Sequence, residues 1–556
     1  MCEVKNNVKF LLSQVFGIFI CAISYTNADN LPPLNMYLAD SPYPIAHVDA
    51  TASGLARWSG PVAERSRTLD DNEIIFKPVG FADGFSYLYS GHYPNGRRAI
   101  FAGGADRITK LDADTLRTIS TYVLREGPLY SEMQVENFFD DVDKLIFEAR
   151  EDHTKAQNVY ERIYDTMIPA LKKGAGSIYK FVNNENELYI CIRDPLTGQI
   201  SIKVFGDSEA GNFYSPIVLK RSFDFPLDKV SDSLPMAMNV TYDGWIIAVM
   251  NDGQVFAVSP DFKKLDYLLL PEAQGGAGKS DQWMGGTVRN SIAIDDDGGI
   301  YIVSRVFLHR VQWTGSRLSL DTADGAWSVA YESGENGSGT TPTPIGWGKS
   351  NDLLVAMLDG VGNVNIYWRD VIPEDWEGIP GQPRRLAGTL PLTFGENTPD
   401  SFRIESSPVA LGYGFFWPND TAKNQPSWQG SFDKQLFANY TATTFKEHAV
   451  FGGAKYEWNP ERRELEVGWI TPLSLAPTIC TPSINNLLYC IGRRENFASV
   501  EVINWQTGKS EFHYLIGDSY RYNPAACNTR VTEEYIEVSS VGSAILRLYP
   551  QKNFKK

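Results

Sequence analysis

The sequence is poor in the residues that most often build metal and redox centres. It has only 6 cysteines and 6 histidines in 556 residues. No cysteine pair has a CxxC spacing, and no two histidines lie at a metal-binding spacing. A Gly-x-Ser-x-Gly elbow for a serine hydrolase is also absent. We therefore predict no metal and no cofactor, with calcium and a quinone kept open as alternatives.

The chain also lacks an excess of basic residues. Its 51 Lys and Arg stand against 67 Asp and Glu, which gives a formal net charge of −16. Nucleic acids and anionic membranes bind basic patches, so the charge argues against both as partners. After the first 28 residues, no apolar run reaches the ~20 residues that a membrane-spanning helix needs. We expect a monomer with no nucleic-acid partner and no membrane span.

The N-terminus has the pattern of a signal peptide. Lys5 and Lys9 precede a mostly apolar run over residues 11–25, and Ala28 supplies a small residue for cleavage. The run is short for a membrane span, although an uncleaved anchor is the alternative. We therefore interpret residues 1–28 as a signal peptide. The expected location is the periplasm or the extracellular medium.

Cleavage would leave four cysteines: Cys191, Cys480, Cys490 and Cys527. An oxidising compartment allows them to form disulfides. Cys480 and Cys490 flank a predicted hairpin turn at residues 483–486, and simple hairpin register places them opposite each other. A Cys480–Cys490 disulfide is one interpretation. Four buried free thiols are the other.

A long-period repeat predicts an all-β fold. Residues 29–80 are irregular and rich in proline, and we interpret them as an N-terminal arm. From 81 to 550 the chain repeats sets of short strands separated by polar turns, which is typical of a β-propeller. The predicted innermost strands are 84–89, 177–182, 236–240, 291–294, 341–345, 407–411, 477–480 and 524–527. These sets predict a single propeller with eight blades. Seven blades are the alternative, because the sixth set is irregular.

The last set stops after three strands, near Leu548. A strand from the arm, at residues 73–76 or nearby, would complete it and close the ring. Two insertions interrupt the repeat: residues 131–173, where apolar residues recur at helical spacing, and residues 417–447, which are polar and loop-like. Each insertion is either a lid over a functional site or a structural cap.

Five segments in the second half carry a family resemblance. They are GTTPTP at 339–344, YWRDVIPEDW at 367–376, ESSPV at 405–409, YEWNP at 456–460 and WQTG at 505–508. Over about residues 285–550 the chain resembles uncharacterised exported bacterial proteins with a quinoprotein-like, eight-bladed propeller. The resemblance implies a fold and a blade number rather than an activity. Quinone-dependent dehydrogenases typically carry adjacent cysteines, and this sequence has none.

Residues at the start of inner strands point towards the central channel of a propeller, where converging polar groups form the default ligand site. Small polar residues there also relieve crowding near the axis, which is the structural alternative. The predicted ligand-binding residues are Asn290, Thr340, Thr341, Ser406 and Asn523.

Two functions follow from this arrangement. The preferred one is non-catalytic binding of a small molecule or a protein partner at the mouth of the channel. The alternative is an oxidoreductase, lyase or hydrolase acting on a small organic substrate in the channel. Arg289 would then bind an anionic group, and Asp83 or Glu405 would act as acid or base.

Overall fold

The computed structural model describes most of the chain between residues 30 and 550. The described ranges are 30–83, 87–125, 130–172, 179–194, 196–230, 233–276, 286–348, 352–402, 405–423, 445–476, 480–524 and 529–550. The predicted signal peptide and residues 424–444 of the predicted loop insertion lie outside them.

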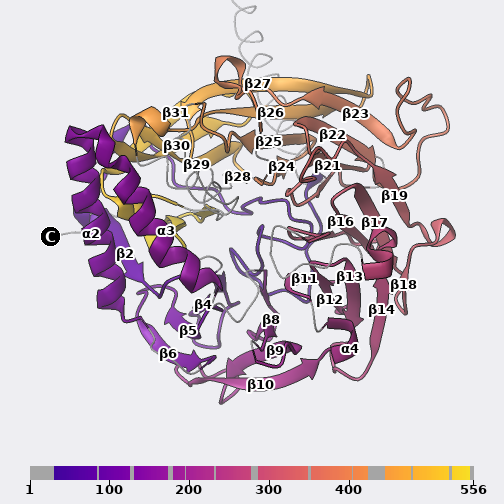
Figure 1. The fold of residues 1–556 in the computed structure, drawn as a ribbon, viewed down its shortest axis with the longest axis horizontal. Helices are drawn as coiled ribbons and strands as arrows, with labels where there is room; N and C mark the ends of the chain where they lie inside the picture. Colours follow the sequence, from indigo (N-terminus) through magenta and orange to yellow (C-terminus); the bar gives the residue numbers. More distant parts are fainter. Residues whose placement is uncertain are drawn as a thin grey trace, which may run out of the picture.

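Eight β-sheets stand around a ring like the blades of a propeller (Figure 1). From blade 1 to blade 8, the inner strands are β3 (Leu88–Tyr89), β7 (Phe181–Val182), β11 (Pro235–Val240), β15 (Ala293–Ile294), β20 (Thr343–Ile345), β24 (Val409–Leu411), β28 (Thr481–Ser483) and β32 (Arg530–Val531). The second strands are β4 (Ala99–Gly103), β8 (Leu188–Arg193), β12 (Ile246–Met250), β16 (Gly299–Val303), β21 (Leu354–Leu358), β25 (Gly414–Pro418), β29 (Leu487–Arg494) and β33 (Ile536–Ser540).

The third and outer strands complete each blade. The third strands are β5 (Arg107–Asp112), β9 (Ile200–Asp207), β13 (Gln254–Val258), β17 (Phe307–Trp313), β22 (Asn363–Trp368), β26 (Phe451–Asn459), β30 (Phe497–Asn504) and β34 (Ala544–Leu548). The outer strands are β6 (Thr118–Val123), β10 (Ile217–Asp224), β14 (Leu265–Leu269), β18 (Leu318–Ser319), β23 (Leu386–Pro391), β27 (Glu464–Ser474), β31 (Ser510–Gly517) and β2 (Ile74–Pro78). In blade 4, β19 (Trp327–Ala330) also pairs with β17.

Burial explains why the second strands were the clearest in the sequence. The five residues of β12, Ile-Ile-Ala-Val-Met, are all buried, because neighbouring blades cover both faces of the sheet. Tight turns precede several of these strands, and Gly244 (φ 90°) and Asn486 (φ 60°) adopt the left-handed conformation that such turns need. The eight sheets confirm the predicted eight-bladed propeller, and the seven-blade alternative is wrong.

Two predicted inner strands, at 477–480 and 524–527, fall mostly on residues 477–479 and 525–528, which lie outside the described ranges. In blade 7, Leu475 forms an isolated bridge with Gly492 of β29, and β28 pairs with β29 from Thr481 on. In blade 8, Pro524 forms an isolated bridge with Ser540 of β33, and β32 pairs with β33 from Arg530 on.

The N-terminal arm closes the ring, as predicted. β2 pairs antiparallel with β34, from Ile74 opposite Leu548 to Pro78 opposite Ala544. Immediately before it, β1 (Arg67–Thr68) pairs parallel with β31 of blade 7. The arm therefore contributes strands to the last two blades. Blade 8 thus has four strands, and its outermost strand comes from the N-terminal arm.

The predicted helical insertion between blades 1 and 2 forms α2 (Glu132–Glu151) and α3 (Ala156–Lys172). Ser131 caps α2, because its side chain accepts from the backbone N–H of Gln134 while the Gln134 side chain accepts from that of Ser131. The two helices pack against each other, and α2 contacts β2. They lie over one side of one face of the ring, hereafter the helix face (Figure 1).

The other described helices are short. They are α4 (Leu227–Val230) and the 3-10 helices η2 (Asp71–Glu73), η3 (His153–Lys155), η4 (Pro271–Gly276), η6 (Thr322–Asp324), η7 (Gly395–Asn397), η8 (Lys446–His448) and η9 (Tyr520–Tyr522).

The arm also enters the central channel, which the sequence did not predict. Residues 30–40 lie across the face opposite the helices, where Asn35 donates to the carbonyl of Val240 at the end of an inner strand. Residues 41–56, hereafter the channel segment, then run between the inner strands. The Ala50 carbonyl accepts from the backbone of Ile294, and Ser53 O accepts from Ala410 N–H. The channel is thus filled from the arm side by the chain itself.

Candidate functional site

The channel segment folds back on itself in a strained turn. His47 (φ 62°) and Val48 (φ 79°) both have left-handed backbone conformations, which is unusual for any residue except glycine and rarest for a β-branched one. Asp49 holds the turn, since its Oδ1 accepts from the backbone N–H groups of Thr51 (3.0 Å) and Ser53 (3.2 Å). Such strain persists only where surrounding structure imposes it, and it concentrates at functional sites.

The turn presents His47 to the inner strands. The side chain is buried, with Nε2 lying 3.2 Å from Oγ1 of Thr341 and the ring stacked on Tyr179 at a centroid distance of 6.0 Å. Burial lowers the pKa of His47 to about 4, so the imidazole is neutral at physiological pH. Within the described residues, its Nδ1 is buried without a hydrogen-bond partner.

Hydrogen bonds extend from Tyr179 and Thr341 to further blades. The Tyr179 hydroxyl donates to Oδ1 of Asn290, and Nδ2 of Asn290 donates to the carbonyl of Gly339. The Thr341 N–H donates to Oγ of Ser407 at 2.9 Å. Groups from blades 2, 4, 5 and 6 therefore meet around His47. Two predicted ligand residues, Asn290 and Thr341, are among them.

Thr340, a third predicted residue, is fully buried next to this network. Its Oγ1 lies 2.8 Å from Oγ of Ser338, and its backbone N–H donates to the same hydroxyl. Its contacts among the described residues are local, so it supports the loop that carries Thr341.

Arg289 and Glu405 come together from blades 4 and 6. Nη1 of Arg289 lies 3.0 Å from Oε1 of Glu405, and Nη2 donates to the carbonyl of Gly337 at 3.2 Å. The Arg289 side chain is only 3% exposed. Its Nε is buried and has no partner among the described residues.

Asp420 lies beside this ion pair. Its Oδ2 accepts from the backbone N–H groups of Glu405 and Ser406, each at 3.2 Å. Burial raises the pKa of Asp420, although these N–H donors oppose the shift. Ser406, a predicted ligand residue, thus contributes its backbone to the arrangement. We call His47, Tyr179, Arg289, Asn290, Thr341, Glu405 and Asp420 the mouth cluster.

Asp83, the other predicted acid or base, lies on blade 1. It is 1% exposed, and its Oδ1 accepts from the N–H of Ala105 at 2.9 Å. Burial and repulsion from Asp106 raise its pKa to about 8, while Arg107, 3.7 Å away, lowers it. Its charged neighbours are therefore Asp106 and Arg107. No contact among the described residues links it to Arg289.

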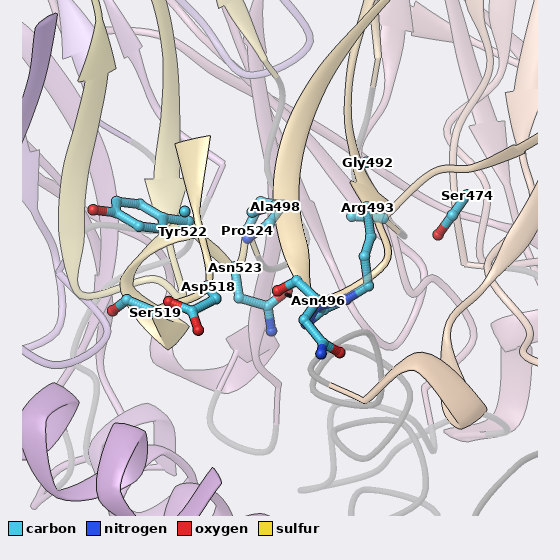
Figure 2. A pocket seen from close by; sticks show the side chains of 12 residues that line it. Ser474, Gly492, Arg493, Asn496, Ala498, Asp518, Ser519, Tyr522, Asn523 and Pro524 are labelled. Atoms are coloured by element: carbon cyan, nitrogen blue, oxygen red, sulfur yellow. Dashed lines mark hydrogen bonds between the residues drawn. The ribbon is translucent and has the colours of Figure 1, made fainter. Parts of the chain in front are cut away.

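Asn523 lies apart from the mouth cluster, in a small depression between blades 7 and 8. The side chains of Arg493, Asn496 and Asn523 lie next to one another there, with Asp518 and Ser519 alongside (Figure 2). Asn523 N–H donates to the carbonyl of Tyr520, which positions it at the end of a 3-10 turn.

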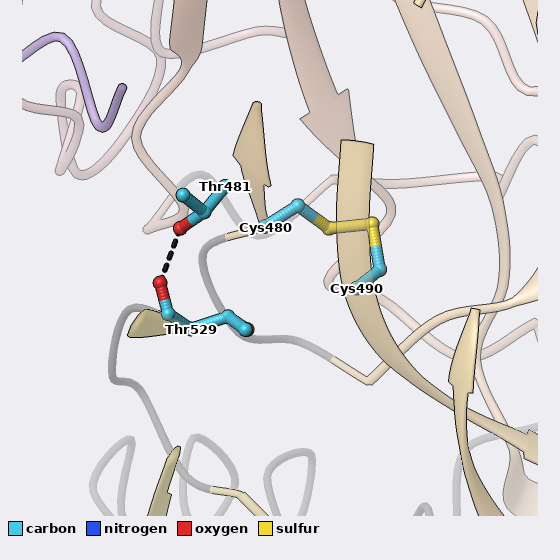
Figure 3. The surroundings of a disulfide bond; sticks show 4 residues. All are labelled: Cys480, Thr481, Cys490 and Thr529. Carbon is cyan, nitrogen blue, oxygen red and sulfur yellow. Dashed lines mark hydrogen bonds between the residues drawn. A yellow bond between two sulfur atoms is a disulfide. The ribbon is translucent and has the colours of Figure 1, made fainter. Parts of the chain in front are cut away.

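Blade 7 contains a disulfide between Cys480 and Cys490 (Figure 3). The Cα atoms are 4.5 Å apart, and the register that pairs Thr481 with Tyr489 places the two cysteines opposite each other. The neighbouring Thr481 hydroxyl donates to the carbonyl of Thr529 in blade 8. Cys191 is a buried free thiol, and Cys527 lies outside the described residues.

Sequence reasoning missed His47, Tyr179 and Asp420. Nothing local in the sequence marks them, because His47 reaches the site through the path of the arm, and it is 294 residues from Thr341. The two positive-φ residues that shape the turn, His47 and Val48, are not turn-forming types such as Gly or Asn.

In the part of the chain that the structure describes, no group of three or more His, Cys, Asp or Glu side chains is arranged to hold a metal ion. Across the same residues, no helix combines the length and apolar character needed to cross a membrane.

Comparison with known proteins gives one clear relative. An uncharacterized protein of Archaeoglobus fulgidus is 33% identical over 331 residues, which cover 57% of this chain and 61% of that protein. The chain thus matches less than two thirds of the relative's length. No family model matches the chain, so the quinoprotein-like resemblance stays a prediction.

Solved structures show only distant likeness. BamB from Moraxella catarrhalis has a TM-score of 0.36 and 8% identity, covering 65% of this chain and 93% of that one. A functionally unknown protein from Desulfotomaculum acetoxidans DSM 771 has a TM-score of 0.34 and 11% identity, covering 74% and 96%. Likeness at this level carries no argument about function.

Proposed function

We propose that this protein is an exported, non-catalytic binding propeller that holds a small polar molecule at the mouth cluster. The observation that carries the proposal is a pair of buried, unsatisfied groups, Nδ1 of His47 and Nε of Arg289. An unsatisfied buried donor or acceptor costs about 1–3 kcal/mol, and native proteins keep few of them. A bound molecule with polar groups would satisfy both atoms.

The position of the cluster supports the same function. Arg289, Asn290 and Glu405 precede inner strands, at the ends of the strands that lie towards the helix face. The channel segment fills the channel from the opposite side, so a ligand would arrive from the helix face. A few fixed polar groups that converge at the channel of a propeller are typical of small-molecule binding.

The charges favour a neutral ligand. His47 is neutral, and the charge of Arg289 is balanced by Glu405 at 3.0 Å. The remaining groups are the hydroxyls of Tyr179 and Thr341, the amide of Asn290 and the carboxyl of Asp420, whose pKa is raised by burial. These groups bind hydroxyls and carbonyls well, so we propose a sugar-like or other polyhydroxylated molecule.

A thermal-shift screen followed by calorimetry tests the proposal. The compounds expected to bind are neutral sugars and polyols, and the compounds expected not to bind are quinones and charged acids. A ligand that binds only the folded state raises the midpoint of unfolding in proportion to ln(1 + [L]/Kd). His47→Asn should abolish the shift, since asparagine tolerates positive φ but lacks the ring. His92→Asn, at an exposed position, is the matched control. Equal shifts in wild type and His47→Asn would contradict the proposal.

One observation favours the enzyme alternative. Asp420 has a raised pKa and lies next to the Arg289–Glu405 pair, which is the setting of a general acid. If the protein were an enzyme, Asp420→Asn would abolish turnover of a ligand found in the screen while leaving its affinity similar. No turnover by the wild type would support binding alone, and turnover that is unchanged in Asp420→Asn would show that Asp420 is not the acid.

Export is part of the proposal. The Cys480–Cys490 disulfide supports it, because disulfides persist in oxidising compartments and are rare in the cytosol. Intact-mass measurement of protein from the native host tests it. We expect a chain beginning after Ala28, with two cysteines resistant to alkylation unless a reductant is added. A full-length, fully alkylated chain would contradict export.

A further inference from the structure

We infer that Ser328, His309 and Glu272 form a second site, in which Ser328 is a nucleophile that hydrolyses esters of short carboxylic acids. The site lies on the outer part of blade 4, where β19 pairs with β17, and it shares no residue with the mouth cluster. It therefore goes beyond the proposed function, which concerns binding at the mouth cluster alone.

Two hydrogen bonds join the three side chains in a line. Oγ of Ser328 lies 2.7 Å from Nδ1 of His309, and Nε2 of His309 lies 2.9 Å from Oε1 of Glu272. This is the order of nucleophile, base and carboxylate in a serine-hydrolase triad, with the two ring nitrogens exchanged. Such triads are defined by geometry and roles, so they also occur without a Gly-x-Ser-x-Gly elbow.

Glu272 fixes the positions of the ring protons. Burial raises the pKa of Glu272, but its hydrogen bonds, first of all the one from His309, outweigh burial and leave this pKa below its ordinary value. An ionised carboxylate can only accept, so Nε2 of His309 carries the hydrogen and donates it to Glu272. Nδ1 is then the acceptor for the hydroxyl of Ser328, which is the tautomer that a general base needs.

The register of β17 and β19 brings Ser328 to the ring. The N–H of Tyr331 donates to the carbonyl of Val306 at 3.3 Å, and hydrogen-bonded pairs alternate along the ladder from there. His309 and Ser328 therefore form a non-hydrogen-bonded pair, in which Cα atoms are about 4.5 Å apart and side chains are close. The side chain of His309 is completely buried, whereas Ser328 is exposed. A substrate can thus reach the hydroxyl while the base stays shielded.

The same register supplies a donor for the negative charge of the transition state. In a non-hydrogen-bonded pair the backbone N–H points away from the partner strand, so the N–H of Ser328 points away from β17. A carbonyl oxygen held by this N–H has its carbon next to Oγ of the same residue.

The surface beside Ser328 selects the substrate class. Phe307 and Ala330 form the pair two residues along, so they share the sheet face of His309 and Ser328 and offer apolar contact to an acyl chain. Ala330 is exposed and Phe307 is half-buried, so this surface is open and suits a short chain. An ester suits the single oxyanion donor better than an amide does, because an alcohol is the better leaving group.

The reaction balances with water as the only co-reactant. Oγ of Ser328 attacks the ester carbonyl carbon while its proton passes to Nδ1 of His309. The tetrahedral intermediate expels the alcohol, which takes that proton. Water then attacks the acyl group on Ser328 and gives a proton to His309. This proton returns to Oγ as the carboxylic acid leaves. Glu272 stays ionised throughout and is a positioning residue.

Covalent labelling of the full-length protein with an alkyl fluorophosphonate tests the nucleophile, because this reagent modifies activated serines. Peptide mass mapping should find the label on Ser328, and hydrolysis of p-nitrophenyl acetate is measured in parallel. Ser328→Ala lies at an exposed position and should fold normally, lose the label and hydrolyse the ester about a hundredfold more slowly. Ser316→Ala changes an exposed serine of the same blade, whose hydroxyl lies 3.3 Å from that of Thr314, and should retain both activities.

Variants of the other two residues test their roles. His309→Gln should lower kcat about a hundredfold, the contribution expected of a general base. Glu272→Gln should lower kcat by at least about tenfold and leave KM unchanged, a split that a loss of folded protein would not mimic in active-site-titrated samples. A wild-type protein that does not take the label, a label on another residue, or hydrolysis that is equal in wild type and Ser328→Ala overturns the site.

Discussion

Nε of Arg547 lies 2.6 Å from Oε2 of Glu537, and both side chains are completely buried. The pair belongs to blade 8, but it also joins blade 1. The Tyr89 hydroxyl of blade 1 donates to Glu537 at 2.7 Å and accepts from Arg547 at 2.9 Å. Arg547 also donates to the carbonyl of Ala113. This ion pair therefore stabilises the junction between the last blade and the first.

Glu537→Gln should strongly destabilise the protein. The substitution leaves the buried Arg547 without its counter-ion, and breaking a buried pair in this way costs about 3–5 kcal/mol. Urea unfolding monitored by circular dichroism measures the loss. Glu534→Gln, at an exposed position in the same blade, is the control and should change stability by less than about 0.5 kcal/mol. A Glu537→Gln protein as stable as the control would refute the role of the pair.

Removing the disulfide should destabilise blade 7. The Cys480→Ser/Cys490→Ser double variant lacks a cross-link with a sequence separation of 10 residues, and such a cross-link contributes about 2–4 kcal/mol. Equilibrium unfolding measures the loss in the free energy of unfolding. The variant is compared with the wild type, with and without reductant. Cys191→Ser alters a buried thiol without breaking a bond and controls for loss of packing. Equal stability of wild type and the double variant would show that the cross-link contributes nothing.

Asp83 should make the protein less stable as the pH rises. Its pKa is about 8 in the folded state, against about 3.9 for an unfolded aspartate. Between these values the folded state holds a proton that the unfolded state has lost, so stability falls as the pH rises from about 4 to about 8. Asp83→Asn should flatten this part of the profile. Asp114→Asn, which is exposed, should leave the slope as in wild type.

His47 should not titrate in the physiological range. With a pKa near 4, its ring stays neutral down to about pH 5, and the stability associated with the neutral ring is lost as the pH falls from 6.5 through 4. Two-dimensional NMR of the histidine ring protons measures the titration, with His47→Asn used to assign the signal. A midpoint near 6.5 would show that the ring is accessible to water.

The architecture could be predicted because strands and turns leave local signals. The alternation of apolar runs with turn residues marked the second strands, and the missing strand of blade 8 implied that the arm closes the ring. The path of the channel segment left no such signal, because its contacts, such as Ala50 with Asn239, connect residues 189 positions apart.

The candidate site was predictable only in part. Arg289 and Glu405 were chosen for their residue type and their place before inner strands, and the ring brings them together across blade 5. Asp83 satisfied the same criteria but lies on blade 1, beside Arg107. Position along a strand therefore predicts that a residue faces the helix side of the ring. It does not predict which blade's residues it will contact.

Closure of the ring by β2 sets the order in which the molecule can be assembled. Ile74 is made long before its partner Leu548. Blade 8 therefore stays incomplete until Leu548 has been made, and the channel segment has few of its partners before the later blades exist. Pairing over so long a separation predicts slow folding after synthesis. A chain that stays unfolded until it is complete remains free to be threaded through a translocation pore before it folds.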